Sequence, residues 1–255
     1  MKKKLAISLS LFATVLLAND LDTQNTIEKS VRDILPNAPI SKIEVSDISN
    51  IYKAYLPNGQ ILYIEPTTKI VIVGEMVKPN GYSITQADQM QWQKELETKQ
   101  IANLTPEKLT KNSLKIEFGK GSKKYEFAIF TDPECPYCLK AEEAFNGKDV
   151  TVYVNFMPLD FHKNATGWSL DILSSKNPKQ TSNDIKNGTV KKYEHTKEAK
   201  EQLEKMITIA RELNITGTPK LFIIDKNEKK VIDVINGADI AKIKKYLEPL
   251  ANSNK

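Results

Sequence analysis

The hydrophobic and polar positions of this chain follow different periods in different parts of the sequence. Between residues 40 and 73, short runs of β-branched and aromatic side chains are separated by turn sequences, which is typical of β-strands. Apolar residues at helical spacing predict a short helix from Asp22 to Leu35, and Pro57-Asn58-Gly59 predicts a hairpin between the second and third strands. The predicted strands are Ile40–Val45, Ile51–Leu56, Ile61–Glu65 and Ile70–Val73.

The next part of the chain is polar. The segment from Thr85 to Leu104 is rich in Gln, Glu and Lys and has only scattered apolar residues, which predicts a helix that is polar on most faces. Such a helix often connects domains through solvent. We therefore expect residues 81–110 to form a helical linker, with its helix ending at Thr105-Pro106.

From residue 111 onward, strand and helix patterns alternate. A polar stretch from Pro158 to about Val190, broken by Gly and Pro, predicts a small helical insertion. The predicted strands are Leu114–Phe118, Tyr125–Phe130, Val150–Met157, Lys220–Asp225 and Val231–Ile235, and the predicted helices follow Cys135, run from Lys197 to Leu213, and close the chain through Ile240, Ile243, Leu247 and Leu250. This order is that of a thioredoxin-like α/β domain, which we expect over residues 111–255.

The first module has a thin core, because one helix and four short strands share residues 19–80. A module of this kind gains stability by pairing an exposed sheet edge with a second copy of itself. We therefore expect residues 19–80 to be an α+β dimerisation domain and the protein to be a homodimer. A plain packing subdomain is the alternative.

The N-terminus has the pattern of a signal peptide. Lys2, Lys3 and Lys4 precede an apolar run from Leu5 to Leu17, and Ala18 supplies a small residue for cleavage. We expect residues 1–18 to be removed and the mature protein to be exported and soluble. Without these lysines the formal charge falls from +5 to about +2, and the remaining lysines are interspersed with Asp and Glu, so no nucleic-acid partner is expected.

The candidate chemistry lies in the motif Cys135-Pro136-Tyr137-Cys138, which holds the only two cysteines of the chain. A buried strand precedes the motif and a helix follows it, so Cys135 falls at a helix start with Pro136 in the first helical position. Unpaired N–H groups and the helix dipole at that place favour a thiolate over a thiol. We expect Cys135 to attack or leave in thiol–disulfide exchange and Cys138 to resolve the mixed disulfide.

Two other interpretations of the cysteine pair remain open. A structural disulfide across so short a loop removes little entropy from the unfolded chain. A zinc site needs about four ligands, and only His162 and His195 could join the cysteines, at spacings unlike those of zinc fingers. Redox chemistry is favoured over both, and no metal or cofactor is expected.

A second motif, Gly217-Thr218-Pro219, stands directly before the predicted strand Lys220–Asp225, at a position where a strand tolerates proline. Sequence alone favours a trans bond before Pro219. With Phe130-Thr131-Asp132 before the cysteines, and Leu62-Tyr63-Ile64 followed by Gly74-Glu75-Met76, the mature chain resembles the exported disulfide isomerases DsbC and DsbG.

This resemblance implies that Pro219 is cis and faces the cysteines, and that the backbone of Thr218 pairs with substrate as an added strand. It implies a periplasmic, V-shaped homodimer whose cysteines are kept reduced by a membrane thiol reductase like DsbD. The partners are then exported proteins with cysteines or wrong disulfides.

The sequence departs from the family in three places. The dipeptide Pro136-Tyr137, which tunes the redox pair, resembles DsbG more than DsbC, and a second cysteine pair of DsbC is missing. Ile129 stands six residues before Cys135, where thioredoxins and DsbA-like oxidases have a buried carboxylate. We expect Glu126 to be a surface residue, so no carboxylate proton relay is assigned.

Four functions follow from these features. The first is a dimeric disulfide isomerase, and the second is a DsbG-like reductase of sulfenic acids on exported proteins. The third is net oxidation of dithiols by the same motif. The fourth is not enzymatic: a holdase chaperone would bind unfolded chains and keep its activity without the cysteines.

Overall fold

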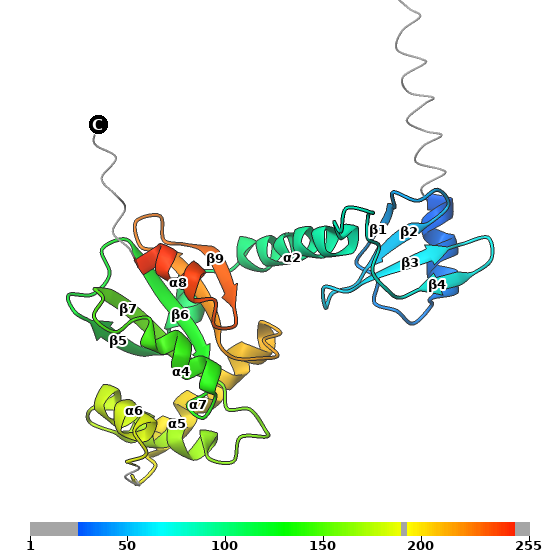
Figure 1. The fold of residues 1–255 in the computed structure, drawn as a ribbon. Helices are drawn as coiled ribbons and strands as arrows, with labels where there is room; N and C mark the ends of the chain where they lie inside the picture. Colours follow the sequence, from blue (N-terminus) through cyan, green and yellow to red (C-terminus); the bar gives the residue numbers. More distant parts are fainter. Residues whose placement is uncertain (1–24, 190–192, 248–255) are drawn as a thin grey trace, which may run out of the picture. The chain divides into compact units, whose positions relative to one another are not determined.

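The computed structural model describes residues 25–189 and 193–247. The chain forms two compact units, of which the first ends at Leu96 and the second begins at Glu97 (Figure 1). Within these described ranges, no helix is both long and apolar enough to cross a membrane. The expected signal peptide, the end of the predicted insertion at Val190 and the last predicted helix position, Leu250, lie outside the described residues.

The first unit contains the expected helix and four-stranded sheet. Residues 25–34 are helical, and the antiparallel strands follow in the order β1-β2-β3-β4. Their bounds are β1 Lys42–Val45, β2 Tyr52–Tyr55, β3 Ile61–Glu65 and β4 Ile70–Ile72. Gly59 has a φ of +87°, a backbone conformation that favours glycine, and it turns the predicted hairpin so that Tyr55 pairs with Ile61.

The sheet of the first unit is covered on both faces. Val31 of the first helix packs on one face with Ala54 and Ile64, whereas Trp92 of helix α2 (Ile84–Ala102) packs on the other with Tyr55 and Tyr63. The Trp92 indole donates to the carbonyl oxygen of Leu56 at 2.8 Å. The side chains on the second face are therefore held by polar contacts as well as by packing.

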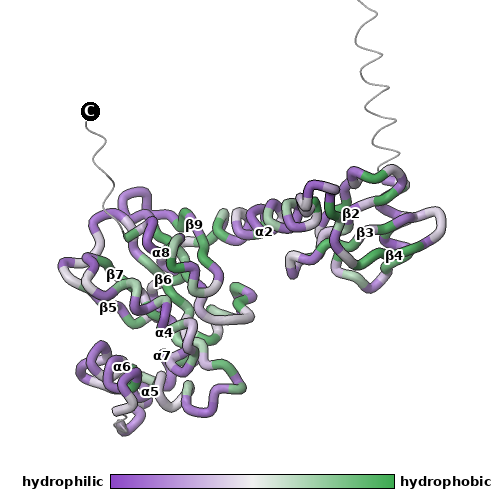
Figure 2. Tube along the Cα trace, in the orientation of Figure 1, coloured by the Kyte–Doolittle hydropathy of each residue, from purple (hydrophilic) through white to green (hydrophobic). Residues whose placement is uncertain are grey.

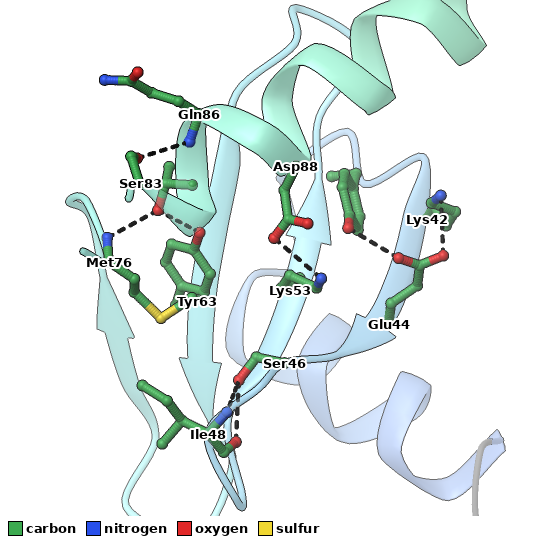
Figure 3. A network of polar contacts seen from close by, with 12 residues as sticks. Lys42, Glu44, Ser46, Ile48, Lys53, Tyr63, Met76, Ser83, Gln86 and Asp88 are labelled. Carbon is green, nitrogen blue, oxygen red and sulfur yellow. Dashed lines mark hydrogen bonds and ion pairs between the residues drawn. The ribbon is translucent and has the colours of Figure 1, made fainter. Parts of the chain in front are cut away.

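A polar network surrounds this second face (Figure 3). The hydroxyls of Tyr63 and Thr85 are 2.6 Å apart, and the Met76 N–H donates to the Thr85 hydroxyl at 2.9 Å. Lys53 forms an ion pair with Asp88 at 3.1 Å. These contacts fix the start of α2 on the sheet.

Helix α2 differs in one respect from the expected solvent-exposed linker. Its surface is mainly hydrophilic (Figure 2), but Trp92 is buried in the core of the first unit, while Ile101 and the following Leu104 pack in the core of the second. A five-residue helix not anticipated from the sequence, α3 (Pro106–Thr110), comes next and buries Leu109 completely. The boundary between the compact units thus falls inside the segment expected as a linker.

The second unit is built on a mixed five-stranded sheet in the order β5-β7-β6-β8-β9. The central strand β6 is parallel to β7 and antiparallel to β8, and β5 and β9 form antiparallel edges. The bounds are β5 Leu114–Phe118, β6 Tyr125–Thr131, β7 Val150–Phe156, β8 Lys220–Asp225 and β9 Lys230–Asn236. This strand order places β6, which precedes the cysteine motif, in the middle of the core.

Helices cover both faces of this sheet. Phe127 and Ile129 of β6 face a core shared with helix α4 (Pro136–Glu143), whereas Ala128 and Phe130 face a second core with α3. The predicted insertion forms two helices between β7 and α7 (Figure 1). The remaining helices are α5 Ala165–Ser174, α6 Pro178–Lys186, α7 Lys197–Glu212 and α8 Ile240–Leu247.

Candidate active site

The cysteine motif lies where β6 passes into α4, as the sequence predicts. Cys135 is the N-cap of α4 with an extended backbone (φ −78°, ψ 120°), and Pro136 occupies the first turn. The exposed fraction is 5% for Cys135 and 0% for Cys138. The strand delivers Cys135 to the N-terminus of the helix, and the first turn then carries Cys138 into the protein interior.

The sulfur of Cys138 is enclosed by polar groups. The backbone N–H of Asp132 donates to this sulfur at 3.4 Å. Burial raises the pKa of the Cys138 thiol to about 12, although the side chains of Thr131 and Thr218 and the Asp132 N–H favour the thiolate. Cys138 is therefore a protonated thiol at neutral pH.

The loop before β8 meets the start of α4. The bond between Thr218 and Pro219 is cis, which confirms the implication of the family resemblance rather than the preference read from sequence alone. The Cys135 thiol donates a hydrogen bond to the backbone carbonyl oxygen of Thr218, with 3.8 Å between the sulfur and the oxygen. Pro219 is buried, whereas Thr216 and Gly217 are exposed, so backbone groups of this loop lie beside the reactive sulfur and next to solvent.

The carboxylate of Asp132, to which the sequence analysis assigned no role, is buried beside the cysteine motif. Asp132 is 0% exposed, and its Oδ1 accepts from the Glu134 N–H at 2.7 Å. Its Oδ2 accepts from the Leu159 N–H at 2.7 Å and lies 3.0 Å from Nδ1 of His162. The carboxylate thereby ties the loop after β7 to the motif, and His162, which the sequence offered only as a doubtful zinc ligand, is its partner.

Ile129 and Glu126 lie in β6, upstream of the motif. Ile129 is fully buried and apolar, so the position six residues before Cys135 carries no carboxylate here. Glu126 is half-buried rather than a plain surface residue. It lies beside Tyr153, whose pKa is raised by burial first and by Glu126 second.

A different carboxylate, Glu142, reaches the motif from α4. Its Oε1 accepts from the Thr131 hydroxyl at 2.8 Å, and its Oε2 forms an ion pair with Lys186 of α6 at 2.7 Å. No local pattern predicts this arrangement, because Thr131, Glu142 and Lys186 come from three separate elements.

Aromatic side chains form an exposed rim around the site. Tyr137 is 66% exposed and Phe161 is 74% exposed. The Phe161 ring stands edge-on against the ring of His162, with centroids 4.5 Å apart.

The described residues contain no group of three or more His, Cys, Asp or Glu side chains arranged to hold a metal ion.

Family models match both parts of the chain. A family model described as a thioredoxin-like domain matches residues 113–251, and one described as the N-terminal domain of disulfide bond isomerase proteins matches residues 18–86. A search of curated proteins returned no match.

Solved structures align with part of the chain. A disulfide interchange protein from Neisseria gonorrhoeae aligns at 20% identity over 55% of this chain and 98% of its own, with a TM-score of 0.41. The catalytic domain of Proteus mirabilis ScsC aligns at 22% identity over 55% and 91%, with a TM-score of 0.38. Pseudomonas aeruginosa DsbA2 aligns at 19% identity over 52% and 90%, with a TM-score of 0.39.

Proposed function

Because this chain belongs to the thioredoxin-like family, as a DsbC-like thiol–disulfide interchange protein, we propose that it isomerises and reduces disulfides of exported proteins through Cys135 and Cys138. The observation that carries the proposal is the difference between the two sulfurs. One is at a helix N-terminus beside a backbone carbonyl oxygen, and the other is completely buried and protonated.

The reaction begins with Cys135. Its thiolate attacks one sulfur of a substrate disulfide, a new S–S bond forms, and the other substrate sulfur leaves as a thiolate. A second substrate thiol can then displace Cys135, which completes isomerisation. Alternatively Cys138 displaces the substrate, which leaves the substrate reduced and the Cys135–Cys138 pair oxidised.

Substrate is held by backbone contacts at Thr218 and by the exposed rim. A peptide that extends beside the loop before β8 can pair with main-chain groups there, and such pairing tolerates many sequences. The side chains of Tyr137 and Phe161 then offer apolar surface to an unfolded chain. Pro136 and Tyr137, which separate the cysteines, tune the stability of the Cys135 thiolate.

The first unit makes the protein a homodimer in this proposal. Strands β1 and β4 are the edges of its sheet, and β4 exposes Ile70 at 52% and Ile72 at 42%, with Val73 beyond it at 68%. An edge of this kind is suited to pairing with a second copy. The protein acts in the periplasm, where disulfides persist, and a membrane thiol reductase like DsbD keeps its cysteines reduced.

The in vivo redox state of the pair tests this proposal. Trapping free thiols in cells with a mass-shifting alkylating agent should show mostly reduced Cys135 and Cys138, and the purified protein should recover activity of a scrambled multi-disulfide enzyme. A mostly oxidised pair would instead indicate a dithiol oxidase. A protein without cysteines that still prevents aggregation and rescues the substrate would indicate a holdase.

The dipeptide Pro136-Tyr137 favours a second candidate, because it resembles that of DsbG. In this alternative, Cys135 reduces sulfenic acids on single cysteines of exported proteins. Its thiolate attacks the sulfenyl sulfur, the S–O bond breaks, and the oxygen leaves as hydroxide, which takes a proton from solvent to become water. Cys138 then resolves the mixed disulfide. Reduction of a sulfenylated model protein without isomerase activity would favour this role.

A further inference from the structure

Asp132 contacts both cysteines of the motif through its backbone. Its N–H donates to the Cys138 sulfur at 3.4 Å, and its carbonyl oxygen accepts from the Cys135 N–H at 3.1 Å. In the reaction described above, the Cys138 sulfur is the atom that becomes a thiolate when the mixed disulfide is resolved. A residue outside the four-residue motif therefore gives a hydrogen bond to the resolving sulfur and also closes the turn that leads to the attacking one.

The peptide group between Thr131 and Asp132 is held on its other side as well. The carbonyl oxygen of Thr131 accepts from the Met157 N–H at 2.8 Å, directly after β7 ends. The N–H that faces Cys138 belongs to the same planar peptide group. A hydrogen bond accepted by the carbonyl oxygen polarises the group, which makes its N–H a stronger donor. The chain that follows β7 therefore helps to orient this donor.

The side chain of Asp132 is bound to the same segment of chain. Its Oδ2 accepts from the Leu159 N–H at 2.7 Å and lies 3.0 Å from Nδ1 of His162. A carboxylate accepts hydrogen bonds, so the ring nitrogen supplies the hydrogen. Its Oδ1 accepts from the Glu134 N–H at 2.7 Å and braces the turn. The backbone and the side chain of Asp132 are thus both fixed by the loop after β7.

We propose that Asp132 is the positioning residue of the resolution step: its side chain, held by Leu159 and His162, keeps its own N–H directed at the Cys138 sulfur, where this N–H stabilises the thiolate. The inference rests on the proposed function, since it concerns the second step of that reaction. A hydrogen bond to a charged acceptor is roughly twice as strong as one to a neutral acceptor, so the contact favours the thiolate over the thiol.

The step balances in protons and electrons. The Cys138 proton passes to water, and the thiolate attacks the Cys135 sulfur of the mixed disulfide. The Cys135–Cys138 bond forms, the Cys135–substrate bond breaks, and the substrate sulfur leaves with the electron pair and takes a proton from water. The cysteine pair is oxidised and the substrate is reduced, so no further reductant is required.

A two-phase reaction separates resolution from attack. The reduced full-length protein is mixed with an aromatic disulfide whose thiolate is coloured, so that the first equivalent reports attack by Cys135 and the second reports resolution by Cys138. In Asp132→Ala the N–H loses its fixed direction. The first phase should be unchanged, because the contact of Asp132 with Cys135 uses backbone atoms alone.

The size of the effect on the second phase follows from two opposing terms. Loss of a hydrogen bond to a charged group lowers the thiolate fraction by about ten- to a hundredfold. A more basic thiolate is also more reactive, which offsets about half of this loss on a logarithmic scale. We therefore expect Asp132→Ala to slow the second phase by about three- to tenfold.

Substitutions of His162 test the same link with the Asp132 carboxylate in place. His162→Ala removes the ring beside Oδ2 and should slow the second phase by about twofold. His162→Asn supplies a side-chain N–H in place of that of Nδ1 and should restore the wild-type rate. Asn164→Ala is the matched control, because it removes a side-chain hydrogen bond of the same loop, to Glu134 at 3.1 Å, and should behave as wild type.

The amide proton of Asp132 reports the contact directly by NMR. A hydrogen bond to sulfur moves this resonance downfield, so Cys138→Ala should shift it upfield. His162→Ala should shift it in the same direction by a smaller amount, and His162→Asn should return it to the wild-type position. A residue that only stabilised the fold would leave this resonance unmoved in Cys138→Ala.

Three results would overturn the inference. One is a wild-type second phase in Asp132→Ala or, where that variant does not fold, in His162→Ala. Another is an equal slowing of both phases in Asp132→Ala, or a slowing by Asn164→Ala as large as that by His162→Ala, because general loop order would then be the cause. The third is an Asp132 amide resonance that does not move in Cys138→Ala. Absence of the first phase in the wild-type protein would instead contradict the proposed function itself.

Discussion

The sulfur of Cys135 lies 3.8 Å from the backbone carbonyl oxygen of Thr218, 83 residues further along the chain. The oxygen belongs to the main chain, so this contact does not depend on the side chain at position 218. The reactive sulfur therefore lies beside main-chain atoms, and in the proposed function these atoms pair with a substrate backbone, a contact that tolerates many sequences.

Cys138→Ala is expected to trap substrates as mixed disulfides. Without Cys138, a complex at Cys135 is released only by an external thiol, so most of the protein recovered from cells under acid quench should be linked to other proteins. Non-reducing electrophoresis measures this. Cys135→Ala should yield no such complexes, and equal trapping by the two variants would contradict the assigned roles.

The buried Cys138 thiol is expected to lower stability at alkaline pH. Its pKa in the native protein is raised by burial to about 12, whereas a thiol in an unfolded chain ionises near pH ~8.5. Between these values the native state binds more protons than the unfolded state, so the free energy of unfolding falls as pH rises. From pH ~8.5 to ~10.5 the reduced wild-type protein should lose about 2 kcal/mol more than Cys138→Ser.

Urea unfolding at several pH values measures this difference. Buried tyrosines also ionise in alkali, but they are present in both proteins and their contribution cancels in the comparison. Parallel stability curves for the two proteins would show that the Cys138 thiol is not held protonated.

Asp132→Ala is expected to destabilise the second unit. The substitution removes the acceptor for the partly buried N–H of Leu159 and for His162, and a donor left unsatisfied away from water costs about 1–3 kcal/mol. We expect a loss of about 2–4 kcal/mol in the unfolding of this unit. Trp168 fluorescence in a Trp92→Phe background measures it during urea unfolding, and Asp160→Ala, at an exposed carboxylate of the same loop, should change stability by less than about 0.5 kcal/mol.

The first unit is expected to dimerise through an edge of its sheet. The full chain should sediment as a dimer at micromolar concentration, and Ile72→Lys on β4 or Val45→Lys on β1 should give a monomer, because a charge on the paired edge opposes association. A monomeric wild-type protein would remove the premise, and dimers in both variants would place the interface elsewhere.

A shortened chain tests what the dimer contributes. It should begin at Glu97 rather than near Lys111, because Leu104 and Leu109 are buried in the core of the second unit. This protein should be monomeric, should reduce simple disulfides, and should lose isomerisation of a multi-disulfide substrate. Isomerisation equal to that of the full chain would show that the dimer is not required.

The sequence predicted the regular elements well because their signals are local. Strands β3, β5 and β8 have the predicted bounds, since alternating or continuous apolar runs end there at turn residues. Helix α3 has only five residues and no apolar period, so the hydrophobic pattern does not predict it.

The site was predictable only in part. The cysteine motif and its helix start are consecutive in sequence, and their geometry follows from local rules. The pairing of Asp132 with His162, 30 residues away, depends on how the loop after β7 folds back. The contacts of Glu142 depend on the packing of α4 and α6, and the cis bond before Pro219 was implied by family resemblance alone.

The ion pair between Glu142 and Lys186 has a consequence for how relatives of this chain should be classified. Lys186 belongs to α6, which is part of the insertion between β7 and α7. A change confined to the insertion therefore alters the charge beside the cysteine helix while the four motif residues stay the same. Two chains with an identical Cys-Pro-Tyr-Cys motif need not be functional equivalents, and an alignment meant to group them has to include the inserted helices.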